Sequence, residues 1–350
     1  MCVCISSVNA ENVDSVSASE SSEHALTARE KFEQQFNAPC DRTPQIHGVF
    51  RGRYEGEWPD YESRFQVRNM RVLVRGKIMP TIDYYCRVDL CNKGSFTFLD
   101  AWARWYFLPE WNVKIGRYRV PFGVDDFRGP GTYVFANRSF IARTMANVRE
   151  VGVQFAYSSK RIPLTVEAGL FNSATGTNQD VWQKQLDFAG KVTYSVGEVT
   201  LSGSYLSMYP HGVRINMEDG SVSWSHGNLM LEGEYQHLHY CEDTYPDVHA
   251  ALAFASYGVP VRWYPFNLLS FHTRWDYMTN HSSGNPDDNG LLQTDDPQRH
   301  RLTLGASLSC NIKKVKAEFI LDYEKYFYRQ GVTAPVGAND KICAEVVVSF

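Results

Sequence analysis

The feature that most constrains the fold is a change of side-chain character at every second residue, which begins at Gln45 and continues to the C-terminus. In residues 315–324 the odd positions carry Val, Ala, Phe, Leu and Tyr, and most even positions are charged. Residues 301–312 repeat the pattern. Because successive side chains of a β-strand point to opposite faces, a period of two predicts strands of about ten residues with one apolar and one polar face.

The connections between these strands alternate between short and long. We expect short turns near Met79-Pro80, Pro109-Glu110, Arg161-Ile162, Gly197-Glu198, Gly227-Asn228, Pro265-Phe266 and Ile312-Lys313. We expect the other connections at 56–62, 91–96, 121–148, 172–185, 208–219, 241–247, 279–299 and 328–340. All of this second group are long except the first, second and sixth.

Seven turns and eight other connections predict about sixteen antiparallel strands, with both termini on the short-turn side. A transmembrane β-barrel has short periplasmic turns and longer external loops, whereas a soluble sandwich gives no reason for the alternation. The predicted fold is therefore an all-β, transmembrane antiparallel β-barrel. Aromatic residues near the short turns suit a membrane-interface girdle, with ordinary core packing as the alternative: Trp105, Phe107, Trp111, Trp263, Tyr264 and Phe266.

Hydropathy does not decide between a soluble and a membrane protein here. No apolar run approaches the roughly 18 residues that a membrane-spanning helix needs, so a helical membrane protein is excluded. The mean hydropathy of -0.36 suits a soluble protein. It suits a wide transmembrane barrel equally, because half of each strand faces water.

Charge is distributed unevenly along the chain, whose net charge is -4. Residues 1–40 hold two basic and six acidic side chains, whereas residues 51–149 hold fourteen Arg and three Lys against ten Asp and Glu, a balance of +7. An anion would be attracted to the second segment.

The N-terminal region has a composition of its own. Val8-Asn9-Ala10 resembles the end of a signal peptide, so we expect residues 1–10 to be a signal-peptide remnant and the mature chain to begin near Glu11; an ordinary N-terminal segment is the alternative. Residues 11–43 are expected to form an acidic periplasmic leader with a short helix near Phe32, and residues 44–350 the barrel.

Three motifs between Phe65 and Gly169 resemble the phosphate-selective porin O and P family of Gram-negative bacteria. The first is Phe65-Gln66-Val67-Arg68-Asn69-Met70-Arg71-Val72 before Gly76, although Asn69 stands where the family often has a second arginine. The second is Val113-Lys114-Ile115-Gly116-Arg117-Tyr118-Arg119-Val120-Pro121-Phe122-Gly123. The third is Asn137-Arg138-Ser139, followed by Arg149-Glu150-Val151-Gly152-Val153. The C-terminal Phe350 also resembles the strand end that the barrel-assembly machinery recognises.

The resemblance implies that the longest connection, 121–148, folds inward as loop three and narrows a water-filled pore. Its basic residues are Arg128, Arg138 and Arg143, with Arg149 at its exit. Guanidinium groups suit phosphate because they stay charged and donate paired hydrogen bonds.

The period of two adds basic residues on the pore wall. If Val72, Val74 and Ile78 face lipid, Asn69 and Lys77 face the lumen with Arg71 and Arg75. The same reasoning places Arg87, Arg104 and Lys114 inside and puts Leu99, Ala101, Ala103 and Trp105 on the lipid side. The predicted anion-binding residues are Arg71, Arg75, Arg87, Arg104, Lys114, Arg128, Arg138, Arg143 and Arg149. The alternative is that these groups pair with lumen carboxylates or lipid phosphate and only brace the wall.

These observations predict an outer-membrane channel for passive diffusion of small anions, foremost phosphate or polyphosphate, in a Gram-negative bacterium. We expect a homotrimer in contact with outer-membrane lipid, with no nucleic-acid partner and no cofactor. The alternatives are a non-selective, structural or adhesive barrel and an outer-membrane hydrolase. No catalytic motif supports a hydrolase, so we do not expect an enzyme.

Metal sites have little support. The eight cysteines have no metal-ligand spacing. His237, His239 and Cys241 share a strand face and are weighed as metal ligands, with solvated loop residues as the favoured alternative. The acidic residues Asp287-Asp288 and Asp295-Asp296 lack the ordered spacing of a Ca²⁺ site.

Overall fold

The computed structural model describes residues 28–145, 148–173, 179–180, 182–209, 213–282, 284, 288 and 291–350. The chain divides into two units, Met1–Ala38 and Pro39–Phe350. In the first unit the helix α1 covers Ala28–Asn37. The expected signal-peptide remnant (residues 1–10) and residues 11–27 of the expected leader lie outside the described residues. No helix in the described ranges is long and apolar enough to cross a membrane.

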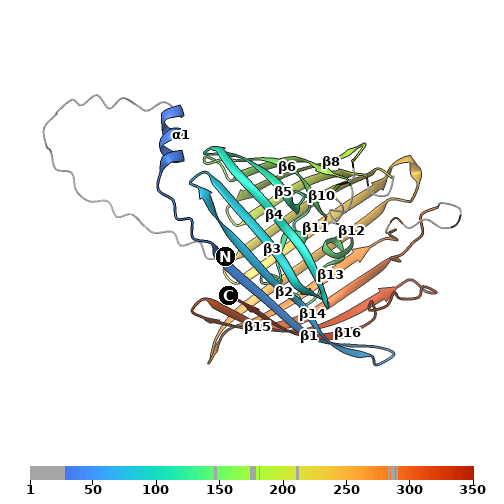
Figure 1. The fold of residues 1–350 in the computed structure, drawn as a ribbon. Coiled ribbons are helices and arrows are strands. Elements are labelled where there is room, and N and C mark those ends of the chain that lie inside the picture. The colour runs from blue at the N-terminus through green and yellow to red at the C-terminus, as the bar shows by residue number, and fades with distance from the viewer. Residues whose placement is uncertain are drawn as a thin grey trace. The chain divides into compact units, whose positions relative to one another are not determined.

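The second unit is a β-barrel whose sixteen strands are all found in the described part of the chain (Figure 1). The first eight are β1 (Gln45–Glu57), β2 (Ser63–Met79), β3 (Ile82–Asn92), β4 (Ser95–Leu108), β5 (Trp111–Arg119), β6 (Arg149–Ser158), β7 (Leu164–Asn172) and β8 (Leu186–Val196). The second eight are β9 (Val199–Met208), β10 (Ile215–His226), β11 (Leu229–Tyr240), β12 (Val248–Trp263), β13 (Phe266–Met278), β14 (Arg299–Ile312), β15 (Val315–Tyr328) and β16 (Lys341–Ser349). The short helices are η1 (Asp125–Phe127), η2 (Ile141–Met145) and η4 (Cys241–Asp243).

Each strand pairs antiparallel with its neighbours in sequence, and β1 pairs with β16 to close the ring. The closing register runs from Val49 opposite Ser349 to Glu57 opposite Lys341. Beyond it, the backbone N–H of Gly48 donates to the carbonyl of Phe350 over 2.9 Å. Closure leaves no strand edge with unpaired backbone groups, which a bilayer requires. The predicted sixteen-stranded antiparallel barrel is confirmed.

The connections follow the predicted order, with two differences. The seven short turns lie at the predicted places or within one residue of them. The β3–β4 connection is only Lys93-Gly94, both with positive φ. The predicted connection 208–219 is too long, because β10 begins at Ile215. Ile215 and Met217 are buried in apolar surroundings, so this segment gains more as a strand than as a solvated loop.

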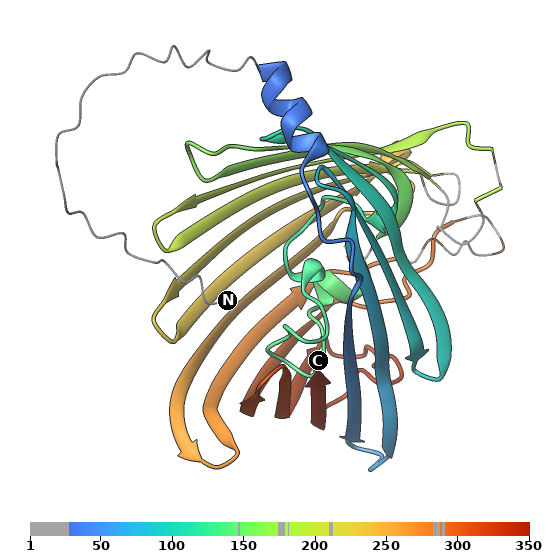
Figure 2. The ribbon, with the colours of Figure 1, turned by 60° about the vertical axis from the view of Figure 1, so that its left-hand side comes forward.

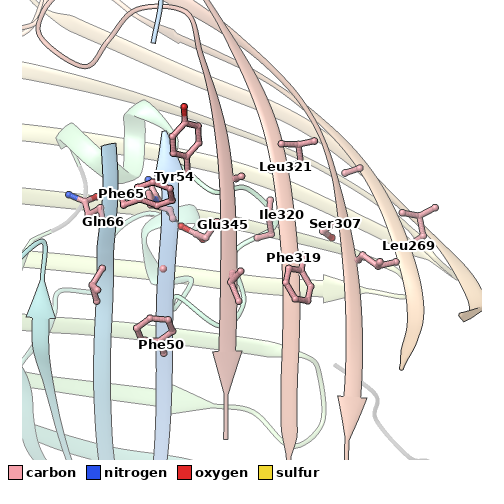
Figure 3. A pocket seen from close by; sticks show the side chains of 17 residues that line it. Phe50, Tyr54, Phe65, Gln66, Leu269, Ser307, Phe319, Ile320, Leu321 and Glu345 are labelled. Carbon is pink, nitrogen blue, oxygen red and sulfur yellow. Dashed lines mark hydrogen bonds and ion pairs between the residues drawn. The ribbon is translucent and has the colours of Figure 1, made fainter. Parts of the chain in front are cut away.

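Side chains alternate across the wall as the sequence predicts. On β1, Arg51, Arg53 and Glu55 are buried, whereas Phe50 and Tyr54 are exposed on the other face. The exposed face is apolar, as a surface that faces a bilayer requires. On this face a groove of about 970 Å³ runs over β1, β2 and β13–β16. Figure 3 shows the rings of Phe50, Phe65 and Phe319 around it.

Leu99 contradicts the predicted alternation. The β3–β4 register shifts between Arg87 and Val88, which leaves Leu99 without a partner in the ladder. This β-bulge turns Leu99 inward, where it is buried and lines a lumen cavity instead of facing lipid.

Near the short turns, Trp105, Trp111 and Trp263 are exposed on the outer face, as an interfacial girdle requires.

Candidate functional site

The connection between β5 and β6, residues 120–148, is called loop three here, and its described residues 120–145 and 148 lie inside the barrel (Figure 2). Its first anchor is on β9 and β11. The backbone N–H groups of Val124 and Asp125 donate to the two carboxylate oxygens of Glu234 over 2.7 and 2.9 Å, and the N–H of Gly123 donates to the hydroxyl of Ser204 over 2.9 Å. A buried carboxylate therefore satisfies backbone donors that have no partner within the loop.

Arg128 forms the second anchor. Its guanidinium donates to both carboxylate oxygens of Glu232 on β11 and to Asp125 Oδ1, the latter over 2.6 Å. Burial alone would raise the pKa of Asp125, but the positive charges of Arg128 and Arg274 and the hydrogen bonds from Ser139 and Arg128 together lower that pKa below its usual value. Ser139 donates to the other oxygen of Asp125 over 2.5 Å, which ties the two halves of loop three together.

The tip of loop three reaches the opposite wall. The N–H of Ala136 donates to Asp322 Oδ2 on β15 over 2.7 Å, and its carbonyl accepts from Arg51 and Arg53 on β1 over 2.7 and 2.5 Å. Arg301 of β14 donates to the carbonyl of Arg138 over 2.7 Å. Because its anchors lie on β9–β11 at one end and on β1, β14 and β15 at the other, loop three crosses the lumen.

Apolar side chains pack one side of loop three against the barrel wall. Phe122, Phe140 and Ile141 of the loop are at most 1% exposed. They belong to a cluster with inward residues of β7–β13, among them Leu206 and Phe254. Burying each such side chain contributes about 1.5–3 kcal/mol, which holds the loop against this wall. Sixteen strands suggest a lumen that is open through its middle. Loop three fills the side next to β7–β13, so the remaining space lies along β1–β6 and β14–β16.

That space contains a cavity of about 780 Å³, called the arginine cavity here. Its lining is strongly basic, and Glu55 and Glu150 are the two acidic members. The twelve basic lining residues are Arg51, Arg53, Arg64, Arg68, Arg71, Lys93, Arg117, Arg138, Arg143, Arg149, Arg301 and Lys341.

Several of these guanidinium groups are neutralised by carboxylates. Arg51 and Arg53 share Glu345, at 2.5 and 2.6 Å. The other pairs are Arg71 with Asp89, Arg149 with Asp100, and Arg301 with both Asp276 and Glu324. These five carboxylates, Glu345, Asp89, Asp100, Asp276 and Glu324, are not among the cavity-lining residues. Asp100 and Asp276 also pair with Arg87 and Arg274, which do not line the cavity, so the twelve basic residues exceed the seven carboxylates by at least five.

Four arginines carry much of this excess and are called the free-arginine cluster: Arg68, Arg117, Arg138 and Arg143. None has a carboxylate partner in the described part of the chain. Arg68 donates to Asn92 Oδ1 over 3.2 Å and Arg138 to the carbonyl of Ala142 over 3.3 Å. The guanidinium of Arg117 lies 5.8 Å from the ring of Phe98. These groups keep donor capacity for an anion.

The nine predicted anion-binding residues fall into four places. Arg71, Arg138, Arg143 and Arg149 line the arginine cavity. Arg75 and Arg104 line a second cavity nearer the short turns, and Arg87 and Lys114 lie on the wall between inward-facing neighbours. Arg128 does not line the arginine cavity and is an anchor of loop three. Arg71, Arg87, Arg104, Arg128 and Arg149 form ion pairs with carboxylates, as the bracing alternative expects.

Sequence reasoning missed several cavity residues. Arg51 and Arg53 alternate with glycine and tyrosine on β1, so the period of two could have placed them inside. Arg68 reaches the lumen only because the β1–β2 register shifts beside it. For Arg301, no local signal shows that β14 lies beside loop three.

The described residues contain no group of three or more His, Cys, Asp or Glu that could hold a metal ion. His237 Nε2 and His239 Nδ1 lie 3.1 and 2.8 Å from the two oxygens of Asp247, so this carboxylate binds both rings. Asp287 lies outside the described residues, and Asp296 pairs with Arg299 at 2.8 Å.

A closed sixteen-stranded barrel with an apolar outer face, an inward loop three and a charged lumen defines an outer-membrane porin. The chain matches the sequence profile of the family described as phosphate-selective porin O and P over residues 47–226, just over half its length. It therefore belongs to the phosphate-selective porin O and P family. It is a protein of the Gram-negative outer membrane and a channel rather than an enzyme.

Solved structures show the same fold at low identity. The anion-selective porin from Comamonas acidovorans has a TM-score of 0.59 at 14% identity, with 89% of this chain and 99% of that one covered. Pseudomonas putida OprB has a TM-score of 0.60 at 9% identity, with 88% and 94% covered. The trimer form of Vibrio cholerae OmpT has a TM-score of 0.57 at 11% identity, with 88% and 98% covered. No curated protein matches the chain.

Proposed function

We propose that this porin is selective for small anions, phosphate or polyphosphate foremost, and that the free-arginine cluster is where they bind. The observation that carries the proposal is a cavity of about 780 Å³ in which four guanidinium groups lack a carboxylate partner among the described residues. A guanidinium is permanently charged and donates in a planar fork that matches phosphate oxygens. Weak binding at several such groups lets an anion enter and leave.

The predicted residues take different parts in this proposal. Arg138 and Arg143, together with Arg68 and Arg117, would contact the anion directly. The ion-paired Arg71 and Arg149 would add positive potential at the cavity wall. Arg87, Arg104, Lys114 and Arg75 would continue the basic path toward the short turns. Arg128 would act indirectly, because it fixes loop three.

The assembly is also a proposal. We infer a homotrimer, supported by the trimer form of the similarly folded Vibrio cholerae OmpT. The apolar outer face would contact lipid and neighbouring protomers. Phe350 pairs with Gly48 at the end of the closing strands and would be the residue that the barrel-assembly machinery recognises. Residues 1–10 and 11–43 are proposed to be a signal-peptide remnant and a periplasmic leader.

Single-channel recording in planar bilayers tests the proposal. The reversal potential in a KCl gradient should show chloride preference, and added phosphate should block the chloride current. A non-selective channel without phosphate block would contradict the anion selectivity. A barrel that gives no current would instead be a structural protein.

A further inference from the structure

A second lumen cavity of about 660 Å³ lies in the half of the barrel near the short turns. It combines basic and aromatic side chains: Arg75 and Lys77 of β2, Tyr85 of β3, and Trp102 and Arg104 of β4. Pro39, Asp41 and Thr43, which precede β1, also line it. We call it the aromatic cavity.

Tyr85 and Trp102 form a platform on the inward face of the wall. They are direct partners in the β3–β4 register, and their rings are stacked with centroids 5.1 Å apart and planes 5° apart. Each ring therefore covers one face of the other, and the guanidinium groups of Arg87 and Arg104 lie 5.2 Å from the centroids of Tyr85 and Trp102. A passing solute with an aromatic ring can then pack against the edges of the two rings.

Cationic groups flank this platform. Arg75 lies directly opposite Tyr85 in the β2–β3 register and donates only to the amide oxygen of Gln45, over 3.1 Å. Lys77 donates to the carbonyl of Pro80 over 3.4 Å. Neither has a carboxylate partner in the described ranges, whereas Arg104 is paired with Asp83 at 2.5 Å. Arg75 and Lys77 therefore remain available to an anion.

Lys114 adds a positive charge on the far side of the platform. Its Nζ lies 5.8 Å from the ring centroid of Trp102 and 3.9 Å from that of Tyr118. Arg75, Tyr85 and Trp102 occupy matched positions on three neighbouring strands, so the row extends over about 10 Å at roughly 4.8 Å per strand. That length suits a small molecule with an anionic group at one end and a ring at the other.

We propose that the aromatic cavity binds small phosphate esters with a planar ring, such as nucleoside monophosphates. The phosphate pairs with Arg75 and Lys77, and the ring packs against the edges of Tyr85 and Trp102. Inorganic phosphate has no apolar surface and gains nothing from the platform. This inference rests on the proposed function only in that anions must enter the lumen.

The test measures block of the chloride current in planar bilayers by two probes, adenosine monophosphate and inorganic phosphate, each added to both sides. In the unaltered protein the nucleotide should stay bound longer than phosphate. Trp102→Leu should shorten the nucleotide's residence about tenfold, as expected for loss of an aromatic contact, and leave phosphate block unchanged. Trp105→Leu is the matched control, because that ring lies on the same strand but faces outward.

Equal residence times for the two probes in the unaltered protein would overturn the inference, as would Trp102→Leu channels with unchanged nucleotide block. If Trp102→Leu gives no conducting barrel, Arg75→Gln decides, since this exposed side chain is replaceable without repacking; unchanged nucleotide block there also refutes the site. If the reversal potential of the unaltered protein shows no preference for anions, the proposed function fails instead of this inference, because the two are read from different measurements.

Discussion

The replacement of Arg138 and Arg143 by Gln tests whether local charge sets the selectivity of this channel. Both side chains line the arginine cavity and have no carboxylate partner in the described residues. The double variant removes two of the five excess cationic groups there but keeps polar side chains at both positions. We expect it to conduct with a much weaker preference for anions, although the net charge of the whole chain is already -4.

The size of the effect follows from Coulomb's law. An ion about 6 Å from a unit charge in water gains or loses about 0.7 kcal/mol, so two charges change its energy by about 1.4 kcal/mol. The change has opposite sign for anions and cations, which brings the difference between them to about 3 kcal/mol. Screening at 0.1 M salt, with a Debye length of about 10 Å, roughly halves it. The anion-to-cation permeability ratio should therefore fall about tenfold.

Salt concentration provides a second reading of the same experiment. At 1 M salt the Debye length is about 3 Å, and the same variant should change the permeability ratio by only about twofold. The control is Lys160→Gln with Arg161→Gln, which removes two exposed charges on the β6–β7 turn outside the cavity. The assay is the reversal potential in KCl gradients at both concentrations. An unchanged ratio at 0.1 M, or an equal change in the control, would refute the reasoning.

Three further predictions concern how the lumen is held together. Arg128→Gln leaves the buried Glu232 without its ionic partner and should lower the free energy of unfolding by about 3–5 kcal/mol. It should also make the channel current flicker more. Urea unfolding measures the first effect and channel recording the second, and Arg143→Gln should show neither. Burial raises the pKa of Asp126 to about 7 despite nearby Arg119, so ionisation of this carboxyl lowers the stability of the barrel as the pH rises from about 4 to 7. Asp126→Asn should therefore resist urea better than the parent protein at pH 8 and equally well at pH 4. Variant and parent unfolding at the same urea concentration at both pH values would contradict this. Gly116→Ala should abolish barrel assembly, because the new Cβ would lie 2.2 Å from the carbonyl oxygen of Ala101 at a φ of +133°. Gly190→Ala is the control and should assemble, because its Cβ would lie 3.7 Å from the nearest atom, the carbonyl oxygen of Glu167. Assembly is measured as heat-modifiable protein in outer membranes.

Much of the fold was accessible to sequence reasoning because it depends on local signals. A period of two fixes which face of a strand meets lipid, and turn spacing fixes the number of strands. The inward orientation of Arg71, Arg87 and Arg104 followed from the same rule, and ion pairs across neighbouring strands place all three on one face. Where the ladder carries a bulge, as at Leu99, the rule fails because one extra residue reverses the alternation.

The tertiary structure alone decided which arginines are free to bind an anion and which are neutralised. Arg128 and Arg138 belong to the same loop and look equivalent in sequence. Glu232, about one hundred residues away, neutralises Arg128, whereas no carboxylate of the described residues neutralises Arg138. The sequence determined that the first third of the barrel is basic. How much of that charge reaches the lumen depends on contacts between strands and a loop that are remote in the chain, and their distances are set only when the barrel closes around loop three.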